Sequence, residues 1–474
     1  MPSLPRLLKN VSYAYFVNIL QLAFSLLSNL VIPAVASKSA YANYRILVLY
    51  AGFAGVLHFG LLNGLYLMVI GRSIEETDWQ LLQKLRRALI VLQIGILPIS
   101  YLILERVLPP QINGFVIVTI VICWGLANWI TFHNFYFQGT NQFARFALAN
   151  SVSFIVGIIL LLIIIIGREA KAVYLELTFI MQLLITICVY EILWGNGVKL
   201  KFKKKPIENI NEEGTMLFPI WRRGFSLYLG NLGIVFVFSI GGLVASLLFS
   251  SIQFAEYAFA YGFTSIVYIS FDGLMTVLIP YLAQSGTNSL KEMTSEISII
   301  TLIWLSPIIN WIGLIIIPKW LPQYIDAIPL IYIFTIALPF AAVIRTRIIS
   351  ASTAQGRERL LLTFSIISFL IAVFVIGICC LNSPNLSDVA VAWASVISMS
   401  AIIGGLFVAH KLAKGMKADI RIIANAVLSS LLFLIIGRSN VSFKNGIIYL
   451  LFAAMAILIN WGGYRGKSKQ FRLV

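Results

Sequence analysis

The sequence predicts an all-α, polytopic membrane protein with about fourteen transmembrane helices. Of its 474 residues, 60% are hydrophobic and only 11% are charged, whereas a soluble domain carries roughly 25% charged residues. Apolar runs of about 20 residues, the length that crosses a bilayer as a helix, recur along the whole chain. Such runs fold as helices because lipid offers no hydrogen bonds to exposed backbone groups. No stretch remains for a soluble domain.

The expected spans are the apolar runs that end at charged residues, proline or glycine. The first run exceeds the apolar core of a signal peptide and has no cleavage site followed by soluble chain, so we expect it to be a span. The second run is expected to be one continuous helix. In chain order the spans lie near residues 12–35, 41–70, 88–107, 113–138, 146–167, 171–194, 222–250, 256–283, 297–318, 324–349, 360–381, 388–410, 420–437 and 443–463.

The distribution of Lys and Arg predicts the orientation of these spans, because membrane proteins concentrate both residues in cytoplasmic loops. With the N-terminus inside, the cytoplasmic segments hold about 27 of the 35 Lys and Arg, and the outer segments hold about 7. We therefore expect both termini in the cytoplasm. The asymmetry accounts for the net charge of +17, so we expect membrane lipids as partners and no nucleic acid.

The longest polar segment follows the sixth span and contains KLKFKKKPIENINEEG. We interpret its basic run as a topology determinant, and docking of anionic lipid headgroups is the alternative. The expected parts of the chain are an N-lobe of six spans, a basic cytoplasmic linker, a C-lobe of six spans, and two final spans with a basic cytoplasmic tail. Their bounds are 1–198, 199–221, 222–412 and 413–474.

Short sequence echoes favour a repeat between the two lobes. Asn18 ends YFVN in the first span and Asn231 ends YLGN in the seventh, while Asn63 in the second span and Asp272 in the eighth both precede glycine. The separations are similar, 45 residues in the first lobe and 41 in the second. Transporters are commonly built from repeated halves with the substrate near the membrane midplane.

The first span carries a polar stripe, because at 100° per residue its polar residues share one face. They are Asn18, Gln21, Ser25, Ser28 and Asn29. Small and polar side chains either line a cavity or join helices by packing. We expect Asn18, Gln21 and Ser25 to line a substrate cavity, and packing is the alternative.

The second span carries Arg45, His58 and Asn63. Arg45 and Asn63 are 18 residues apart, so on a continuous helix they share a face and lie about 27 Å apart. His58 lies about 140° from both and is expected to be a hydrogen-bonded packing residue. Arg45 is close to the outer end of its span, so it faces a cavity or extends to the membrane interface.

The eighth span places Tyr261, Tyr268 and Asp272 on one face, with Ser265 between them. An Asp inside the bilayer costs about 2.5 to 3.5 kcal/mol and suggests a functional site, so we expect ion coupling at Asp272. Arg223 and Arg345 lie at span ends. They either rim a cytoplasmic opening or serve only as positive-inside charges.

Several catalytic motifs are missing from the sequence. It contains no G-x-x-x-x-G-K-[ST], H-E-x-x-H or G-x-S-x-G motif and no metal-ligand spacing of Cys and His. The loops on the outer face are too short for a catalytic domain. We therefore expect a protein that is not an enzyme and that uses no cofactor.

The stretch YANYRILVLYAGFAGVLHFGLLNGLYL resembles the Wzx-like O-antigen and capsule flippases of the multidrug/oligosaccharidyl-lipid/polysaccharide (MOP) exporter superfamily. The resemblance rests on Arg45, on His58-Phe59-Gly60, and on Gly64 with Tyr66 and Leu67. Fourteen spans, short loops and a basic linker are also similar to that family. The chain departs from the family at Asn63, where members often carry Asp, and near Met68, where they carry a basic residue.

The resemblance implies two six-helix lobes around a central cavity that opens alternately to either side of the bacterial inner membrane. The implied substrate is an undecaprenyl-pyrophosphate-linked oligosaccharide, the repeat unit of O-antigen in lipopolysaccharide, of capsule or of exopolysaccharide. A glycan polymerase and a chain-length regulator are the implied partners in polysaccharide biosynthesis.

The residues suit such a substrate. Arg can form two charge-assisted hydrogen bonds with phosphate, so we assign pyrophosphate contact to Arg45, with Arg223 or Arg345 as its cytoplasmic counterpart. We assign sugar contact to the polar and aromatic residues Asn18, Gln21, Ser25, Asn63, Asn231, Tyr261 and Tyr268. Asp272 either couples transport to an ion or pairs with Arg45, in which case pyrophosphate competes with it for the arginine.

Three other functions remain open. A cation-coupled multidrug exporter of the same superfamily would share the fold but needs an acidic cavity. A membrane scaffold for glycan assembly would use the polar stripes only for packing. A membrane glycosyltransferase or polymerase needs a larger external loop than this chain offers.

Overall fold

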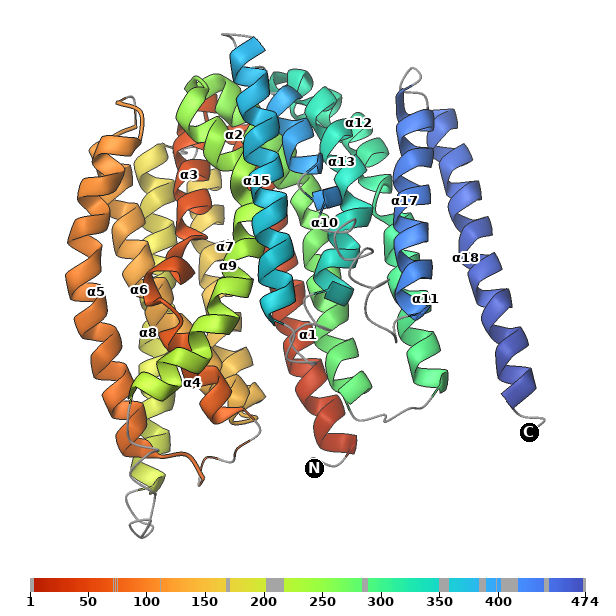
Figure 1. The fold of residues 1–474 in the computed structure, drawn as a ribbon. Coiled ribbons are helices and arrows are strands. Elements are labelled where there is room, and N and C mark those ends of the chain that lie inside the picture. The colour runs from red at the N-terminus through yellow and green to blue at the C-terminus, as the bar shows by residue number, and fades with distance from the viewer. Residues whose placement is uncertain are drawn as a thin grey trace. The chain divides into compact units, whose positions relative to one another are not determined.

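The computed structural model describes residues 4–471 except 71, 73, 75, 111, 168–170, 202–216, 284–288, 349–357, 383–388, 398, 402–416 and 439–442. Throughout the described residues the regular structure is helical (Figure 1), which confirms the predicted all-α fold. Most of the expected basic linker, 199–221, lies outside the described residues.

The elements comprise long helices, short 3-10 segments (η2, η4) and π-helical turns (η1, η5). In chain order they are α1 (Leu4–Leu26), η1 (Leu27–Val31), α2 (Ile32–Val35), α3 (Lys38–Ala51), η2 (Ala54–His58), α4 (Leu61–Val69), α5 (Trp79–Val107), α6 (Gly114–Gly139), α7 (Phe143–Ile166), α8 (Ala172–Lys201), α9 (Leu217–Leu248), α10 (Ser251–Ala283), α11 (Ser289–Leu305), α12 (Ile308–Trp320), η4 (Pro322–Ala327), α13 (Ile328–Val343), η5 (Ile344–Ile348), α15 (Glu358–Asn382), α17 (Lys417–Arg438) and α18 (Phe443–Phe471).

These helices account for the expected spans. Among the described residues, 11 helical stretches are long and apolar enough to cross a membrane, and shorter apolar helices cover 366–378 and 389–401. Each of the fourteen expected spans overlaps a described helix. The chain is therefore a multi-pass membrane protein.

Polar caps mark where three helices begin. The Ser37 side chain accepts a hydrogen bond from the Ala40 backbone at the start of α3. Asp78 caps α5 and Asn113 caps α6 in the same way. Such caps satisfy backbone N–H groups that have no partner within the helix, so short polar loops suffice to start each long apolar helix.

The expectation of one continuous helix over 41–70 is wrong. The segment is divided into α3, η2 and α4, and Phe59 and Gly60 have left-handed backbone angles, with φ of 46° and 84°. Gly52, Gly55 and Gly60 punctuate the break, and glycine tolerates such geometry. The helical face that Arg45 and Asn63 were expected to share therefore does not exist.

The broken segment keeps its backbone hydrogen-bonded, as a segment within a membrane must. Side chains from α5, α6 and α9 donate to carbonyl oxygens that a continuous helix would have used. The bonds are Trp124 Nε1 to Tyr50 O (2.6 Å), Tyr228 OH to Val56 O (2.9 Å), Gln93 Nε2 to Leu57 O (3.2 Å) and Trp221 Nε1 to Phe59 O (2.8 Å). The break is therefore a built feature of the fold.

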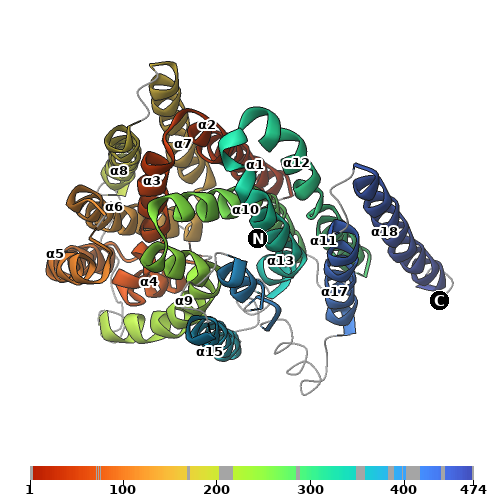
Figure 2. The ribbon, with the colours of Figure 1, turned by 90° about the horizontal axis from the view of Figure 1, so that it is seen from above.

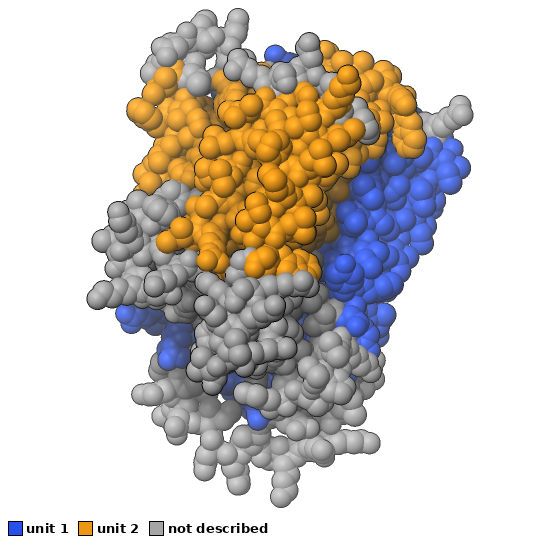
Figure 3. All heavy atoms as spheres, turned by 90° about the vertical axis from the view of Figure 1, so that its right-hand side faces the viewer, with its two compact units in different colours: residues 1–235, 246–255 blue, residues 236–245, 256–474 orange. Residues whose placement is uncertain are grey.

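The chain forms two compact units, which are coloured separately in Figure 3. Unit 1 comprises residues 1–235 and 246–255, and unit 2 comprises 236–245 and 256–474. The division falls within α9, whose first part belongs to unit 1. The expected bounds of two six-helix lobes stay a prediction.

An aromatic core holds α6 and α8 together in unit 1. Helix α6 lies between α5 and α8 in both views (Figures 1 and 2). The buried Tyr190 ring of α8 stacks on His133 of α6 at 5.2 Å and on Phe137 at 5.6 Å between ring centroids. This packing fixes the neighbouring Glu191 side chain between the helices.

In unit 2 the last two described helices are joined to α11 by polar contacts. Trp304 of α11 donates a 2.8 Å hydrogen bond to Asn425 of α17. The hydroxyls of Ser429 in α17 and Tyr449 in α18 lie 2.8 Å apart. Hydrogen bonds between helices stabilise their association in lipid, so α17 and α18 are integral parts of unit 2.

Candidate functional site

Arg45 is held by a neutral side chain from the first span. Its Nη1 donates a 2.7 Å hydrogen bond to Asn29 Oδ1, and Asn29 in turn donates to the carbonyl and hydroxyl oxygens of Ser25. Asn29 lies in the π-helical turn η1, which presents it to α3. Among the described residues Arg45 has no carboxylate partner, and its Nε is buried without a hydrogen bond.

Unit 1 contains a cavity that is lined by both Asn63 and Asn231, two of the expected sugar contacts. Its volume is about 190 Å³. The walls come from the broken second span, from α6 and from α9. The lining residues are Gly52, Gly55, Val56, His58, Asn63, Thr131, Phe135, Tyr228, Asn231, Leu232 and Val235.

Two glycines allow α4 and α9 to meet at this cavity. A side chain at Gly64 would strike the Ile220 backbone of α9, and one at Gly224 would strike the Gly60 and Gly64 backbones. The two backbones are therefore in direct contact, a distance that only glycine permits. This crossing fixes α4, which carries Asn63, against the first part of α9, which carries Asn231.

His58 lies at the end of η2, beside the same cavity. Its Nδ1 accepts a 3.1 Å hydrogen bond from the Gly60 backbone N–H, and its ring lies 5.6 Å from the Tyr228 ring. An imidazole whose Nδ1 accepts carries its proton on Nε2 when neutral. His58 thus has the expected hydrogen-bonded interior position, and it also lines the cavity.

In unit 2 four of the expected site residues form one cluster. Arg345 Nη1 donates to both carboxylate oxygens of Asp272, at 2.9 and 2.7 Å. The guanidinium carbon lies 4.6 Å from the Tyr268 ring centroid, within cation–π range. Tyr261 lies beside Tyr268, with ring centroids 6.4 Å apart. Both charged side chains are partly exposed, 25% for Arg345 and 46% for Asp272.

Within unit 2, Asp272 pairs with Arg345, and within unit 1, Arg45 bonds Asn29. The alternative of a pair between Asp272 and Arg45 stays a prediction. The π-helical turn η5, which contains Arg345, could not be predicted from helical spacing.

The remaining expected residues lie outside both groups. Asn18, Gln21 and Ser25 are partly buried on α1, and Arg223 is exposed on α9. None of them lines the cavity of unit 1. Their assignment to substrate contact stays a prediction.

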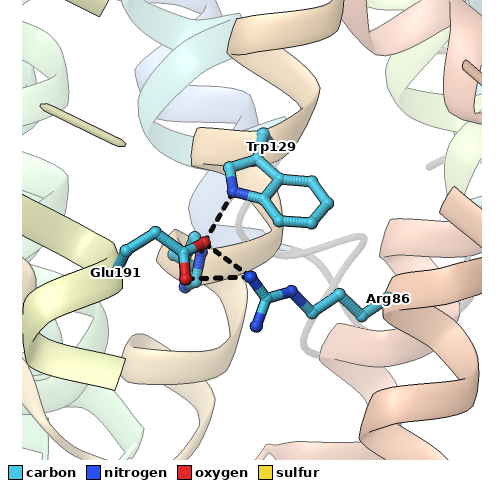
Figure 4. A network of polar contacts seen from close by, with 4 residues as sticks. Arg86, Trp129 and Glu191 are labelled. Carbon is cyan, nitrogen blue, oxygen red and sulfur yellow. Dashed lines mark hydrogen bonds and ion pairs between the residues drawn. The ribbon is translucent and has the colours of Figure 1, made fainter. Parts of the chain in front are cut away.

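Sequence reasoning missed a network around Glu191 in unit 1 (Figure 4). Arg86 Nη2 of α5 donates to both Glu191 oxygens at 2.8 Å, and Trp129 Nε1 of α6 donates to Oε1 at 2.8 Å. His133 Nε2 lies 3.2 Å from the same oxygen. The Arg86 guanidinium also lies 4.8 Å from the Trp129 ring centroid. A carboxylate inside an apolar helix often pairs with a cation, and that tendency could have drawn attention to Glu191.

Comparison with known proteins identifies the fold. No protein-family model and no curated protein matches the sequence. The lipid II flippase MurJ in an inward closed conformation is similar in structure, with a TM-score of 0.58, 15% identity and coverage of 97% of this chain and 99% of that chain.

Two transporters of another kind are similar as well. The eukaryotic MATE transporter AtDTX14 has a TM-score of 0.57 at 12% identity, covering 90% of this chain and 99% of that one. An inward-facing multidrug resistance MATE family transporter of the MOP superfamily has a TM-score of 0.55 at 14% identity, with 88% and 98% covered. This chain therefore shares its fold with these flippase and MATE transporter structures, which agrees with the fold that the sequence predicted.

Proposed function

We propose that this protein is a flippase that carries undecaprenyl-pyrophosphate-linked oligosaccharide across the bacterial inner membrane by alternating access. The observation that carries the proposal is the Arg345–Asp272 pair of unit 2, set against Tyr268 and partly exposed. The fold that this chain shares with MurJ and the MATE transporters supports a transport role but does not identify the substrate.

The pair suits a phosphate-bearing substrate that competes with Asp272. One guanidinium nitrogen of Arg345 serves both carboxylate oxygens, so a pyrophosphate can approach the other terminal nitrogen and then replace the carboxylate. Phosphate favours arginine because of its fixed fork of donors. Once pyrophosphate binds Arg345, the released Asp272 carboxylate could bind a coupling cation or proton. Substrate binding and ion binding would then be linked at this pair.

Arg45 is the second proposed phosphate contact. Its partner Asn29 is neutral, so the guanidinium keeps its full positive charge inside the span. A positive charge inside the bilayer is energetically costly, and binding of an anionic headgroup would offset that cost. Arg45 in unit 1 and Arg345 in unit 2 are thus the proposed phosphate contacts, while the tyrosines and asparagines contact sugar.

The second candidate is a multidrug exporter, and one residue favours it. A cationic drug needs a carboxylate that no arginine neutralises, whereas Asp272 and Glu191 are both paired. Glu176 of α8 differs, because it is 1% exposed and its Oε2 has no hydrogen-bond partner among the described residues. An exporter would depend on Glu176, and the proposed flippase would depend on Arg345.

Complementation of a bacterium lacking its polysaccharide flippase tests the proposal. Wild type should restore surface glycan, and Arg345→Ala should abolish restoration at an equal membrane level. The exposed Arg106 provides the control, because Arg106→Ala should restore glycan like wild type. Because sugar mismatch alone could prevent rescue, hosts with several different repeat units are used. Drug resistance that requires Glu176 and survives Arg345→Ala would contradict the proposal and favour the exporter.

A further inference from the structure

The cavity of unit 1 has few polar atoms left to meet a ligand. The Tyr228 hydroxyl already donates to Val56 O, and the Thr131 hydroxyl donates to Ala127 O. The side-chain donors that remain in the lining are His58 Nε2 and the amides of two asparagines. The rest of the wall is aromatic, aliphatic or glycine. This combination of apolar walls with a few convergent polar groups is typical of small-ligand sites.

Asn63 makes the strongest case that a ligand belongs there. Asn63 is 5% exposed, it lines the cavity, and its amide forms no hydrogen bond within the described part of the chain. An amide that bonds no other protein group is available to a ligand. The amide offers adjacent donor and acceptor groups, which a polar ligand can satisfy together.

The lining also excludes charged ligands. None of the lining residues is an acid, Lys or Arg, so neither a phosphate nor a cation would find a counter-charge. At about 30 Å³ per water in the liquid, the 190 Å³ of the cavity equals the space of several waters, which suits one sugar ring. Phe135 and Tyr228 provide apolar faces for such a ring.

We infer that this cavity is a subsite for a single uncharged sugar ring, hydrogen-bonded by Asn63, by Asn231 and by the Nε2–H of His58. The inference rests on the proposed function, because it adds a sugar subsite in unit 1 to the phosphate contacts. His58 is thereby a ligand contact as well as an interior packing residue. Its Nδ1 bond to Gly60 presents Nε2 as the donor.

Binding of free sugars to the purified full-length protein tests the inference without transport. Saturation-transfer NMR in detergent micelles would use N-acetylglucosamine, glucose and galactose as uncharged probes and glucuronate as the charged comparison. We expect transfer to at least one uncharged probe and none to glucuronate. Asn63→Leu removes two hydrogen bonds at equal bulk, so binding should weaken about tenfold or more.

A blocking variant separates the cavity from the rest of the protein. A side chain at Gly55 would meet only His58 Nε2 within 4 Å, so Gly55→Val should fold normally and abolish sugar binding. Gly95→Val is the matched control, because no atom lies within 4 Å of that position, and it should bind like wild type.

The outcomes separate this inference from the proposed function. Binding that is lost in Gly55→Val supports the subsite even if no lipid-linked substrate is flipped. Absence of binding to every uncharged probe overturns it, whether or not the protein restores surface glycan. Equal binding to Gly55→Val and Gly95→Val, or equal binding of glucuronate, overturns it as well.

Discussion

The backbones of Gly64 in α4 and Gly224 in α9 are in direct contact, and any residue with a side chain at Gly224 would clash with the Gly64 backbone. The contact joins two segments that are far apart in sequence and supports one wall of the unit 1 cavity. It explains how a helix can be interrupted at Phe59 and Gly60 and still be rigid, since Trp221 and Tyr228 bond the break from the same part of α9.

We expect Gly224→Ala to destabilise the protein, because the added methyl group would strike the Gly64 and Gly60 backbones. Overpacking of this kind typically costs about 1 to 3 kcal/mol, and here backbone atoms cannot rotate away. Thermal unfolding followed by size-exclusion chromatography should show a clearly lower melting temperature and less folded protein.

The matched control for this substitution is Gly95→Ala in α5. No atom lies within 4 Å of a methyl group at that position, and alanine is the better helix former. Its melting temperature should equal or slightly exceed that of wild type. A Gly224→Ala protein as stable as Gly95→Ala would show that the α4–α9 crossing can loosen without cost.

The pair in unit 2 predicts a non-additive response to substitution. Arg345→Met removes the guanidinium that bonds the Asp272 carboxylate, and Asp272→Asn removes the negative charge that Arg345 faces. Each single change should cost about 1 to 3 kcal/mol, less than a fully buried pair because both side chains are partly exposed. The double variant should recover part of this loss.

Function should not follow stability in that series. If Arg345 binds pyrophosphate, the double variant should remain inactive in complementation although its melting temperature recovers. Recovery of both properties together would mean that the pair only holds α10 to η5. Additive stability losses in the double variant would mean that the two groups do not interact.

The Glu191 network predicts graded losses. Trp129→Phe removes one of the donors to Oε1 but leaves Arg86 in place, so it should cost about 1 kcal/mol. Glu191→Leu removes the carboxylate that pairs with Arg86 and should lower the free energy of unfolding by more than Trp129→Phe does. A double-mutant cycle of Arg86→Leu with Glu191→Leu, measured by chemical unfolding in micelles, gives the coupling energy.

Arg87, on the same helix as Arg86, provides a negative control. Arg87 is exposed, so Arg87→Leu should change stability little, and its combination with Glu191→Leu should be additive. Coupling of Arg87 to Glu191 as strong as that of Arg86 would contradict the geometry of the network.

The sequence predicted the architecture because it depends on the length and hydropathy of the spans, which any membrane helix must obey. Tyr261, Tyr268 and Asp272 share a cluster, as predicted, because α10 is continuous and helical spacing applies to it. Arg45 and Asn63 were misplaced because the break at Phe59 and Gly60 is stabilised by Trp124, Gln93 and α9. These partners lie far away in the chain, so no local pattern reveals them.

The same limit explains the partners of the charged residues. Asp272 bonds Arg345 and Glu191 bonds Arg86, pairs separated by 73 and 105 residues. Hydropathy shows that a charge lies at depth but does not show which distant charge neutralises it. For Arg45 the partner is an amide in a π-helical turn, which neither charge nor helical period would indicate.

That amide allows the last prediction, which separates phosphate binding by Arg45 from simple bracing of α1 against α3. Asn29→Asp keeps the size of the side chain and gives Arg45 a carboxylate. A charge-assisted bond is stronger than the neutral one it replaces, so the brace should hold at least as well. If Arg45 binds pyrophosphate, however, the new carboxylate neutralises and occupies it, and surface glycan in the complementation assay should fall at least tenfold.

The comparison with Asn113→Asp makes this outcome specific. Asn113 caps α6, and Asp caps a helix as well as Asn does, so that variant should restore glycan fully. Loss of glycan in Asn29→Asp with an unchanged melting temperature would identify a guanidinium that must stay free of carboxylate to work. If Asn29→Asp restores glycan like wild type while Asn29→Ala lowers the melting temperature, Arg45 is a brace, and the phosphate contact must be sought at Arg345 alone.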